Sequence, residues 1–469
     1  MSMALGRLRL LLALWLARAA AVLSRSLGRG GATALPGLLA ERVAPGFVPT
    51  IASQFESGAV LITGTNGKTT TARLLASALS AGGHAFVHNR EGSNLTRGIA
   101  SALVHASDWR GYLKDSRTFA LMETDEVTLT FAAGALQPRA VAFTNLFRDQ
   151  LDRYGEVDAV SSHWRKALDS LPSDTTLVLN ADDPSVAELA LDWSGPLHWY
   201  SLAGAREEAA FPGPADARWC RDCGGVYDYE LRYTGHLGRW RCSVCGRSSP
   251  QPDTRATSIE ATPDGLRLVV SGLGDVEVPL GGIYNAANAL AAISLARVIG
   301  ISNGDIQAGL AATRPAFGRG ELVVLGGLSL RLLLCKNPAG ASEALRLVAD
   351  EDGTVDVAFV LNDRLADGRD VSWIWDVDFE LLSGRINRCW AGGVRAADAA
   401  LRLHYAGWPI SVSSRSTPGS FLDELTQWEG DNPVTILLTY TALLELRAEL
   451  SRRGAYSQST GGRISTATA

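Results

Sequence analysis

The chain has 469 residues, of which 46% are hydrophobic and 20% charged, a composition typical of folded globular proteins and not of disordered or collagen-like chains. Its formal net charge of −5 does not favour non-specific binding to nucleic acid, and six cysteines in so long a chain exclude a disulfide framework of the small secreted kind. At about 150 residues per domain, the length suggests about three domains. The only lysines are Lys68, Lys114, Lys166 and Lys336, so a lysine inside a motif carries more weight than usual.

The first predicted elements are helical. Residues 8–23 are rich in Leu and Ala, and a glycine-rich turn separates them from a second short stretch that begins at Leu35, which predicts two helices within an N-terminal segment of residues 1–55. The first helix is expected either to pack against the protein or to rest on a membrane surface. It lacks the ~20 uninterrupted apolar residues of a membrane-spanning helix. A cleaved export signal is disfavoured, because Arg9 and Arg18 interrupt the run and no clean cleavage site follows.

A phosphate-binding motif comes next. Residues 59–62 predict a buried strand and residues 72–81 a helix, and the turn between them reads Thr63-Gly64-Thr65-Asn66-Gly67-Lys68-Thr69-Thr70. Glycines let backbone N–H groups approach an anion, and the helix N-terminus adds its positive dipole. Lys68 is expected to reach the β- and γ-phosphates of ATP, and the Thr69 hydroxyl to bind Mg²⁺. A strict P-loop would have glycine at Ile62, so this is a shortened variant; the alternative is a glycine turn that binds nothing.

Two further predicted strands, residues 119–122 and 140–144, lead into polar side chains. Glu123 follows the first strand, and Asn145 follows the second. Ligands of open α/β sheets gather at the carboxyl ends of strands, where a carboxylate can hold Mg²⁺. Glu123 is therefore a candidate magnesium ligand, with a helix cap as the alternative interpretation.

At this point the chain resembles the Mur ligase superfamily. The matching segments are residues 63–71, Thr144-Asn145 with the following Asp-Gln-Leu-Asp, residues 284–289, residues 318–321 and Asn337-Pro338. The resemblance implies a ligase that uses ATP to phosphorylate a carboxylate, after which an amine attacks the acyl phosphate. It also implies that Asn285 and Asn288 contact the adenine side of ATP, that Arg319 contacts the phosphates and that Glu123 binds magnesium.

The chain departs from the superfamily pattern at two positions. Gln150 stands where the family usually has histidine. Many members also carry a carbamylated lysine a little further along the chain, and Lys166 lies two residues beyond that position. We therefore assign no carbamate to Lys166.

Four of the cysteines form two CxxCG sequences, Cys220/Cys223 and Cys242/Cys245, with 18 residues between them. Four thiolates from two such turns complete a closed structural Zn²⁺ site, so we expect a zinc ribbon inserted at about residues 217–250; disulfides are the alternative. A closed site has no open coordination position for hydrolysis. The tyrosines, arginines and Trp240 between the two turns favour a small hydrophobic ribbon core over a nucleic-acid-binding face.

From residue 317 onwards, strands and helices alternate again. Strands are expected at residues 328–335, 355–361, 386–391 and 434–439, and helices at residues 341–349, 396–404 and 441–451, a pattern of a mostly parallel sheet with right-handed crossovers. The predicted fold class is therefore α/β. A Mur-ligase-type central P-loop ATPase domain (residues 56–316) contains the ribbon, and a Rossmann-like C-terminal α/β domain (residues 317–453) precedes a tail (residues 454–469) that its composition predicts to be disordered.

The loop after the strand at 355–361 combines aspartates with Trp373 and Trp375. Large aromatic residues at the end of a strand indicate a site or an interface; a solvated acidic loop over packed tryptophans is the alternative. Within the superfamily, the ribbon, residues 89–94, residues 147–150 and residues 367–376 together resemble the synthetase subunits that amidate lipid II. The resemblance implies that the α-carboxylate of D-glutamate in the lipid II stem peptide becomes D-isoglutamine. It places the protein in the cytoplasm or at the inner face of the plasma membrane.

The same resemblance implies a GatD-like glutaminase partner that supplies ammonia. An aspartate of the synthetase subunit completes the partner's Cys–His pair, and the matching residue here is Asp370. The residues agree with a separate ammonia source, because Cys335 and Cys389 lie in apolar strand-like runs, where a thiol is usually inert. Without a nucleophile of its own, the chain needs free ammonium or a second subunit.

Two other functions are weighed against this one. An amino-acid-adding Mur or folylpolyglutamate-type ligase would hydrolyse ATP in response to an amino acid and without a partner. A zinc-ribbon module that binds nucleic acid would show salt-sensitive binding, but the net charge and the lack of a dense basic run argue against it. No nucleic-acid partner is expected.

Overall fold

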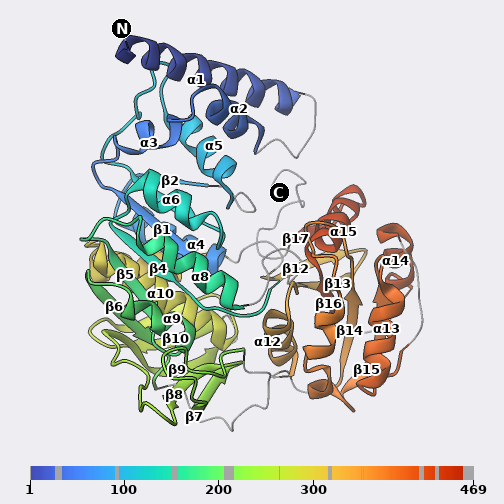
Figure 1. The fold of residues 1–469 in the computed structure, drawn as a ribbon. Coiled ribbons are helices and arrows are strands. Elements are labelled where there is room, and N and C mark those ends of the chain that lie inside the picture. Colours follow the sequence, from blue (N-terminus) through green and yellow to red (C-terminus); the bar gives the residue numbers. More distant parts are fainter. Residues whose placement is uncertain are drawn as a thin grey trace.

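The computed structural model describes residues 2–26, 34–89, 94–149, 157–204, 216–262, 265–314, 319–349, 351, 353–410, 417–427 and 433–457. Figure 1 shows two α/β bodies beside each other, with the N-terminal helices at one end of the first body and the C-terminal domain next to its other half. No helix in these ranges combines the length and the apolarity needed to cross a bilayer.

The chain begins with three helices, α1 (Ser2–Ser26), α2 (Leu35–Val43) and α3 (Phe47–Ala52). The inner face of α1 is fully buried, with Ala13, Leu14 and Ala17 at 0% exposure. This face packs on α2 and on α5 (Thr96–Ala106). The prediction of two helical stretches before residue 55 is confirmed, and the first of them packs against the protein along one side.

The central domain is built on a nine-stranded sheet. Seven neighbouring strands of this sheet run parallel, namely β2, β3, β1, β4, β5, β6 and β9. Strands β10 and β11 extend the sheet as an antiparallel meander. In spatial order the strands are β11 (Gly274–Val278), β10 (Gly265–Val270), β9 (Thr254–Thr262), β6 (Leu197–Ser201), β5 (Thr176–Asn180), β4 (Ala140–Phe143), β1 (Ala59–Thr63), β3 (Phe119–Glu123) and β2 (Phe86–His88). The chain moves from β1 outward to β2 and β3 on one side and to β4 on the other, so the loop after β1 lies where the strand order reverses, the usual ligand position in such sheets.

Helices cover both faces of this sheet. Val60 and Ile62 of β1 pack toward α4 (Lys68–Ala81), α10 (Ile283–Val298) and α11 (Asn303–Ala311). Leu61 packs on the opposite face, toward the N-terminal helices, α5, α6 (Leu129–Leu136) and α8 (Val157–Leu168). Because successive side chains of a strand point to opposite faces, a strand covered on both sides must be apolar throughout, as residues 59–62 are. The short helices α9 (Pro184–Ala187) and η1 (Glu188–Leu191) follow β5.

A two-stranded ribbon is inserted between β6 and β9. It consists of β7 (Tyr227–Thr234) and β8 (Leu237–Cys242), which pair antiparallel. Trp240 is 1% exposed and Tyr227 5% exposed, and they pack edge to face with 5.0 Å between ring centroids. The aromatic residues between the two cysteine turns therefore form a small core, as predicted, and the central sheet resumes at β9.

The C-terminal domain contains a six-stranded sheet in the order β15 (Ile386–Gly392), β14 (Val355–Val360), β16 (Val434–Leu438), β13 (Leu328–Leu334), β12 (Arg319–Leu325) and β17 (Tyr456–Ser457). The first four strands are parallel and the last two antiparallel. One face packs on α12 (Pro338–Ala349), α13 (Ala396–Tyr405), η2 (Ser372–Asp376) and η3 (Phe379–Leu382), and the other on α14 (Pro418–Leu425) and α15 (Tyr440–Arg452). The segment expected as a disordered tail begins at residue 454, yet β17 pairs with β12; residues 458–469 lie outside the described ranges.

Candidate functional site

The loop after β1 turns sharply into α4. Gly64 and Gly67 have positive φ angles of 133° and 86°, and α4 begins at Lys68. A side chain at Gly67 would be strained by the positive φ angle, and its Cβ would lie 2.0 Å from Oδ1 of Asn288 on α10 and displace that amide. The loop thus presents backbone N–H groups and a helix N-terminus at the carboxyl edge of the sheet, which is a ready anion-binding arrangement.

Lys68 points along this loop and is 7% exposed. Its ammonium donates hydrogen bonds to the carbonyl oxygen of Gly64 and, at 3.1 Å, to Oε1 of Glu126. Burial by itself would lower the pKa of Lys68, but the carboxylates of Glu126, Glu123 and Asp149 outweigh burial and raise that pKa above its usual value. Lys68 is therefore a cation surrounded by carboxylates. This environment suits an anion that binds together with a cation.

An oxygen-rich pair lies beside this lysine. The Thr69 hydroxyl is 3.1 Å and 3.0 Å from the two carboxylate oxygens of Glu123. Asn89 fixes the backbone of Glu123, donating to its carbonyl at 2.8 Å and accepting from its N–H at 2.9 Å. A hydroxyl and a carboxylate held this way are ligands that Mg²⁺ prefers, so these two predicted residues fit that ion.

The end of β4 holds the loop in place. The N–H of Asn66 donates to Oδ1 of Asn145 at 2.9 Å, and the Thr144 hydroxyl donates to the carbonyl of Asn66 at 2.7 Å. The Thr65 hydroxyl exchanges hydrogen bonds with the backbone of Phe147 at 3.1 Å and 3.0 Å. The Thr-Asn pair singled out in the sequence thus positions the loop.

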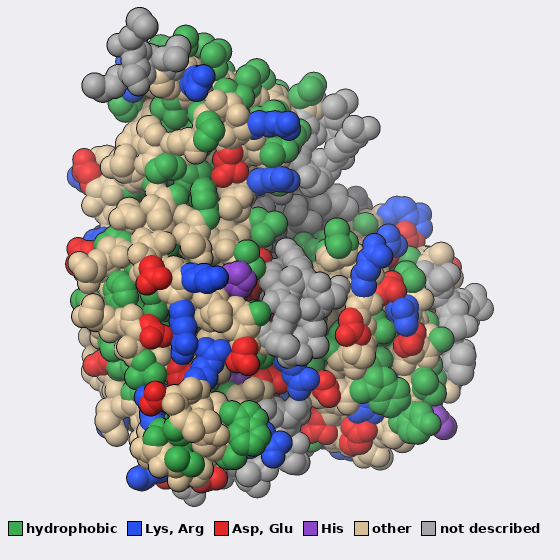
Figure 2. Space-filling model, in the orientation of Figure 1, with side chains coloured by type: hydrophobic (Ala, Val, Ile, Leu, Met, Phe, Trp, Pro, Cys, Tyr) green, Lys and Arg blue, Asp and Glu red, His purple; other side chains and the backbone are tan. Residues whose placement is uncertain are grey.

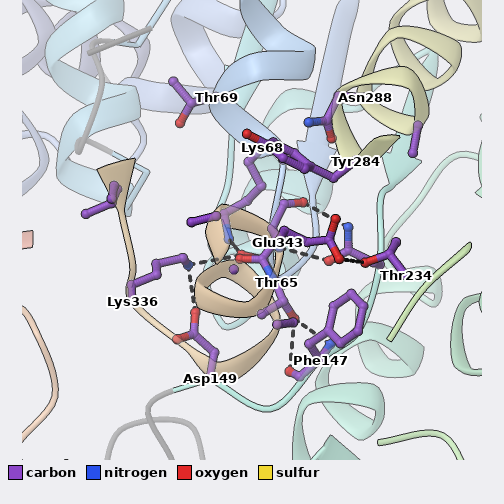
Figure 3. Close-up of a pocket in the computed structure, with 18 of the residues that line it drawn as sticks. Thr65, Lys68, Thr69, Phe147, Asp149, Thr234, Tyr284, Asn288, Lys336 and Glu343 are labelled. Carbon is purple, nitrogen blue, oxygen red and sulfur yellow. Dashed lines mark hydrogen bonds and ion pairs between the residues drawn. The ribbon is translucent and has the colours of Figure 1, made fainter. Parts of the chain in front are cut away.

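The C-terminal domain reaches into the same site through the segment between β13 and α12. The ammonium of Lys336 donates to Oδ2 of Asp149 at 2.7 Å and to the carbonyl of Thr65 at 3.0 Å (Figure 3). Asn337 donates to Oδ1 of Asn66 at 3.0 Å. These contacts tie the phosphate-binding loop directly to the second α/β domain.

A cavity of about 270 Å³ opens between these groups. Figure 3 shows Lys68, Thr69, Asn288 and Tyr284 in the upper half of the view, Lys336 beside Asp149 at lower left, and Glu343 beside Thr234. The turn of the cysteine ribbon forms a further wall with Thr234 and Leu237. Tyr440 of α15 also lines the cavity. The site is thus assembled from three parts of the molecule: the central domain, the ribbon and the C-terminal domain.

The turn of the ribbon is anchored by His236, which is fully buried. Its Nε2 lies 3.3 Å from Oδ2 of Asp183, and its ring packs on Phe147 with 4.4 Å between centroids. On the other side, the Thr234 hydroxyl donates to Glu343 of α12. The ribbon therefore contacts both domains at the edge of the cavity.

Most of the predicted phosphate and magnesium residues line this cavity. They are Thr65, Asn66, Gly67, Lys68, Thr69, Glu123 and Asn288. Three others support it from behind: Gly64 accepts from Lys68, Thr70 is buried in α4, and Asn285 accepts from the Asn288 amide at 3.2 Å. Arg319 begins β12, but its side chain is outside the described part of the structure. Lys166 is an exposed residue of α8 and is not among the lining residues.

Sequence reasoning missed four charged residues of the site, namely Glu126, Asp149, Lys336 and Glu343. A signal for Lys336 existed, because it is one of four lysines and directly precedes the Asn337-Pro338 motif. No local pattern marked Glu343, which lies on an amphipathic helix. Its position at the cavity is fixed by the hydrogen bond that it accepts from Thr234 of the ribbon.

The four cysteines of the ribbon converge. Their Sγ atoms lie within 4.8 Å of one another, with Cys220 to Cys245 at 3.8 Å and Cys223 to Cys242 at 3.4 Å. A tetrahedral Zn²⁺ with Zn–S bonds of about 2.3 Å separates its sulfur ligands by about 3.8 Å, so the cluster fits zinc. All four are free thiols, and the disulfide alternative is not supported.

The remaining two cysteines, Cys335 and Cys389, are 0% exposed, and burial raises the pKa of each thiol to about 12. Neither can act as an accessible thiolate nucleophile. Asp370, by contrast, is exposed in the loop after β14. The N–H and hydroxyl of Ser372 bond its carboxylate, with the N–H at 2.8 Å from Oδ1, and hold the pKa of Asp370 below its usual value. Trp375, in the same loop, is 49% exposed and packs edge to face on Tyr405, which is 68% exposed.

Family models match two parts of the chain. The Mur ligase middle domain matches residues 62–210, and the MurT ligase C-terminal domain matches residues 334–443. The chain is 33% identical over 437 residues to the protein named lipid II isoglutaminyl synthase (glutamine-hydrolyzing) subunit MurT of Streptococcus pneumoniae, covering 92% of this chain and 94% of that protein. It is 32% identical over 403 residues to the subunit of the same name in Staphylococcus aureus, covering 85% and 89%.

Solved structures show the same fold at low sequence identity. A pseudomurein peptide ligase of Methanothermus fervidus has a TM-score of 0.66 at 20% identity, covering 85% of this chain and 79% of that one. MurF of Acinetobacter baumannii has a TM-score of 0.63 at 20% identity, covering 87% and 80%. The folylpolyglutamate synthase of Mycobacterium tuberculosis, solved with ADP and AMPPCP, has a TM-score of 0.58 at 15% identity, covering 88% and 96%.

Proposed function

This chain belongs to the MurT family of Mur-ligase-type proteins, and we propose that it is the synthetase subunit of a lipid II isoglutaminyl synthase in peptidoglycan synthesis. Its substrate is the α-carboxylate of D-glutamate in the lipid II stem peptide, and its product is D-isoglutamine. The observation that carries this proposal is the cavity at the domain boundary, in which a P-loop lysine, a hydroxyl–carboxylate pair and a C-terminal lysine meet. The similarity to MurT subunits over nearly the full length of the chain supports it.

ATP is proposed to bind with its phosphates on the loop from Gly64 to Thr70. On binding, the Lys68 ammonium would break its hydrogen bond to Glu126 and donate to the phosphate oxygens instead. Asn288 of α10 lies against the loop at Gly67. Thr69 and Glu123 would hold Mg²⁺, which would neutralise phosphate charge. Arg319, at the start of β12, remains the proposed second phosphate contact from the domain boundary.

The reaction is proposed to run in two steps. A carboxylate oxygen of the substrate attacks the γ-phosphorus, the bond from that phosphorus to the bridging oxygen breaks, and ADP leaves. Ammonia then attacks the acyl carbon, phosphate leaves and the amide nitrogen loses a proton. Lys68 and the backbone N–H groups of the loop stabilise the charge that develops on the transferring phosphoryl group. Lys336 anchors the C-terminal domain over the site, so both reactants are held together away from water.

The ammonia is proposed to come from a GatD-like glutaminase subunit. The chain has no accessible thiol outside the ribbon to hydrolyse glutamine itself. Asp370 is exposed, and its lowered pKa keeps the carboxylate charged. Such a group can orient and charge-stabilise a histidine of the partner, the third role in a nucleophile–base–acid set. The exposed aromatic pair Trp375 and Tyr405 offers the partner an apolar contact near this loop.

Zn²⁺ is proposed to be structural. The cluster of Cys220, Cys223, Cys242 and Cys245 would fix the base of the ribbon, and the ribbon carries His236 and Thr234 to the edge of the cavity. Four protein ligands leave no open position on the metal, so its contribution is to fold and not to chemistry.

Reconstitution tests the proposal. The purified chain, a GatD-like glutaminase, lipid II and MgATP should convert glutamine to glutamate and lipid II to its amide, detected by mass spectrometry, and ammonium chloride should replace the glutaminase. Amidation that fails with both nitrogen donors overturns the proposal. ATP hydrolysis stimulated by a free amino acid, in the absence of any partner, would favour the amino-acid-adding ligase instead.

A further inference from the structure

Helix α1 has a second apolar face, opposite the one that packs on the protein. Leu8, Leu12 and Leu16 are 54%, 43% and 50% exposed, and their spacing of four residues aligns them along one side of the helix. The same side carries Trp15, Val22 and Leu23 at 47%, 62% and 61% exposure. We call these six side chains the outer stripe. Exposed apolar side chains on a soluble protein are normally single and scattered, so a contiguous group of them indicates a binding surface.

Aromatic side chains of a neighbouring loop border the outer stripe. The indole N–H of Trp15 donates to the carbonyl of Trp109 at 3.0 Å, which fixes residues 109–112 against the helix. Trp109 is 60% exposed and Tyr112 48% exposed. The guanidinium groups of Arg110 and Arg7 lie over these two rings, at 4.5 Å and 4.7 Å from their centroids. Trp and Tyr beside cations are characteristic of the boundary between lipid chains and headgroups.

Positive charge is concentrated at this end of the chain. The first 40 residues contain five arginines and no Asp or Glu, so they contribute +5 to the formal net charge of −5 and the other 429 residues contribute −10. A period of 3.6 residues places Arg7 and Arg18 at one border of the outer stripe and Arg9 at the other. Figure 2 shows hydrophobic and Lys or Arg side chains next to each other at this end of the molecule.

The surface beside the stripe is also basic. Arg18 and Lys114 line a shallow hollow together with His105, Trp109 and Asp108. Asp108 is the one carboxylate in that lining, and one of its oxygens already accepts the N–H groups of Arg110 and Tyr112 at 2.8 Å and 2.9 Å. The hollow therefore keeps a net positive charge.

We propose that the outer stripe, with Trp109 and Tyr112, docks this end of the protein on a membrane of anionic phospholipids. The helix lies in the plane of the interface with its leucines among the acyl chains and its arginines at the headgroups, and does not cross the bilayer. Charge favours an anionic membrane over a second copy of the chain, because in a symmetric dimer the arginines beside the outer stripe would face one another. The inference does not depend on the reaction catalysed.

Vesicle flotation tests the inference with the full-length chain. The probes are vesicles of phosphatidylcholine alone and of phosphatidylcholine with phosphatidylglycerol, both without lipid II. The wild type should float with the anionic vesicles, less so at high salt, and hardly with the neutral ones. The variant Leu8→Ser/Leu12→Ser/Leu16→Ser should lose vesicle binding by about tenfold or more, because three leucines no longer leave water.

A matched control replaces by serine three leucines outside the N-terminal helices, Leu191, Leu365 and Leu401, which are 51%, 78% and 51% exposed, and should float as the wild type does. Both triple variants change only exposed positions, and unchanged ATP affinity verifies that they fold. Equal flotation of the wild type and the α1 variant overturns the proposal, as does a wild type that ignores anionic vesicles. A wild-type dimer that the α1 variant converts to monomer, without vesicle binding, would assign the stripe to a second copy.

Discussion

The ammonium of Lys68 lies 3.1 Å from the carboxylate of Glu126, and both side chains are less than a tenth exposed. A buried charge pair of this kind adds little net stability, because the cost of removing both charges from water offsets much of their attraction. Removing one partner leaves the other charge uncompensated. The pair thus anchors Lys68 to the loop after β1, and under the proposed function Lys68 would leave Glu126 to bind an incoming phosphate.

Replacing this lysine should abolish ATP turnover. We expect Lys68→Ala to reduce turnover by at least about a hundredfold with either glutamine or ammonium as nitrogen donor, because a preorganised charge at a transferring phosphoryl group contributes roughly 3 kcal/mol or more. Phosphate release under saturating ATP measures it. Lys166→Ala, which changes an exposed lysine outside the cavity, is the control. Turnover retained in Lys68→Ala would mean that ATP does not bind here.

The contact between Lys336 and Asp149 should hold the two domains together. We expect Lys336→Met to lower turnover by about tenfold, because two charge-assisted hydrogen bonds that cross the domain boundary are lost. Small-angle scattering of the variant should show a larger radius of gyration. Asp149→Asn, which keeps an acceptor, should cause a smaller effect on both quantities. A compact variant with full activity would remove the bridging role of Lys336.

Asp370 should separate the two nitrogen donors. We expect Asp370→Asn to abolish glutamine-dependent amidation and to leave ammonium-dependent amidation nearly intact, since the exposed carboxylate is proposed to act on the partner and does not line the cavity. Amide formation is measured with each donor in the complex. Asp376→Asn, an exposed aspartate of the same loop, serves for comparison. Loss of both activities in Asp370→Asn would contradict this role.

Removal of zinc should weaken nucleotide binding from a distance. A strong chelator, or Cys223→Ser, is expected to unfold the ribbon and with it the wall formed by Thr234 and Leu237. ATP affinity should fall by about tenfold, a loss of roughly 1.4 kcal/mol, and elemental analysis should find one zinc per wild-type chain. Ser243→Ala, inside the second cysteine turn but not a ligand, should retain the metal. Unchanged affinity after complete metal loss would separate the ribbon from the site.

Asp182 should impose a pH dependence on stability near the ribbon. Burial raises the pKa of Asp182 to about 7, against the opposing hydrogen bonds from Ser201 and Leu202. In the unfolded chain this carboxyl group ionises near pH 4. Between about pH 4 and 7 the folded state therefore keeps a proton that the unfolded state has lost. The free energy of unfolding falls over this range as pH rises, by up to about 1.4 kcal/mol per pH unit.

Urea unfolding of Asp182→Asn isolates this group. An amide can donate to the Ser201 hydroxyl and accept from the Leu202 N–H, so the variant keeps both contacts without an ionising proton. Its stability relative to the wild type should increase from pH 4.5 to pH 7.5. A difference that is constant over this range would show that Asp182 is already ionised throughout.

Local sequence was sufficient to predict the elements that form the site. The apolar run of residues 59–62 predicted a strand buried on both faces, and the glycines that follow it predicted the turn that brings backbone N–H groups together. The spacing of Cys220, Cys223, Cys242 and Cys245 predicted a cluster that the structure contains. These features depend on residues close together in the chain, where periodicity and turn chemistry act directly.

The sequence by itself therefore determined the glycine loop between β1 and α4, the cysteine cluster and the main parallel strands of the C-terminal domain. Only the tertiary structure decided which distant groups complete the site: Lys336 reaches a carbonyl 271 residues away, and Thr234 reaches Glu343 over 109 residues. It also decided which side of α1 faces the protein, because that helix is apolar on two opposite sides and its pattern fits burial on either. Contacts between remote segments are set by how whole layers pack, and no local pattern of residue types encodes that packing.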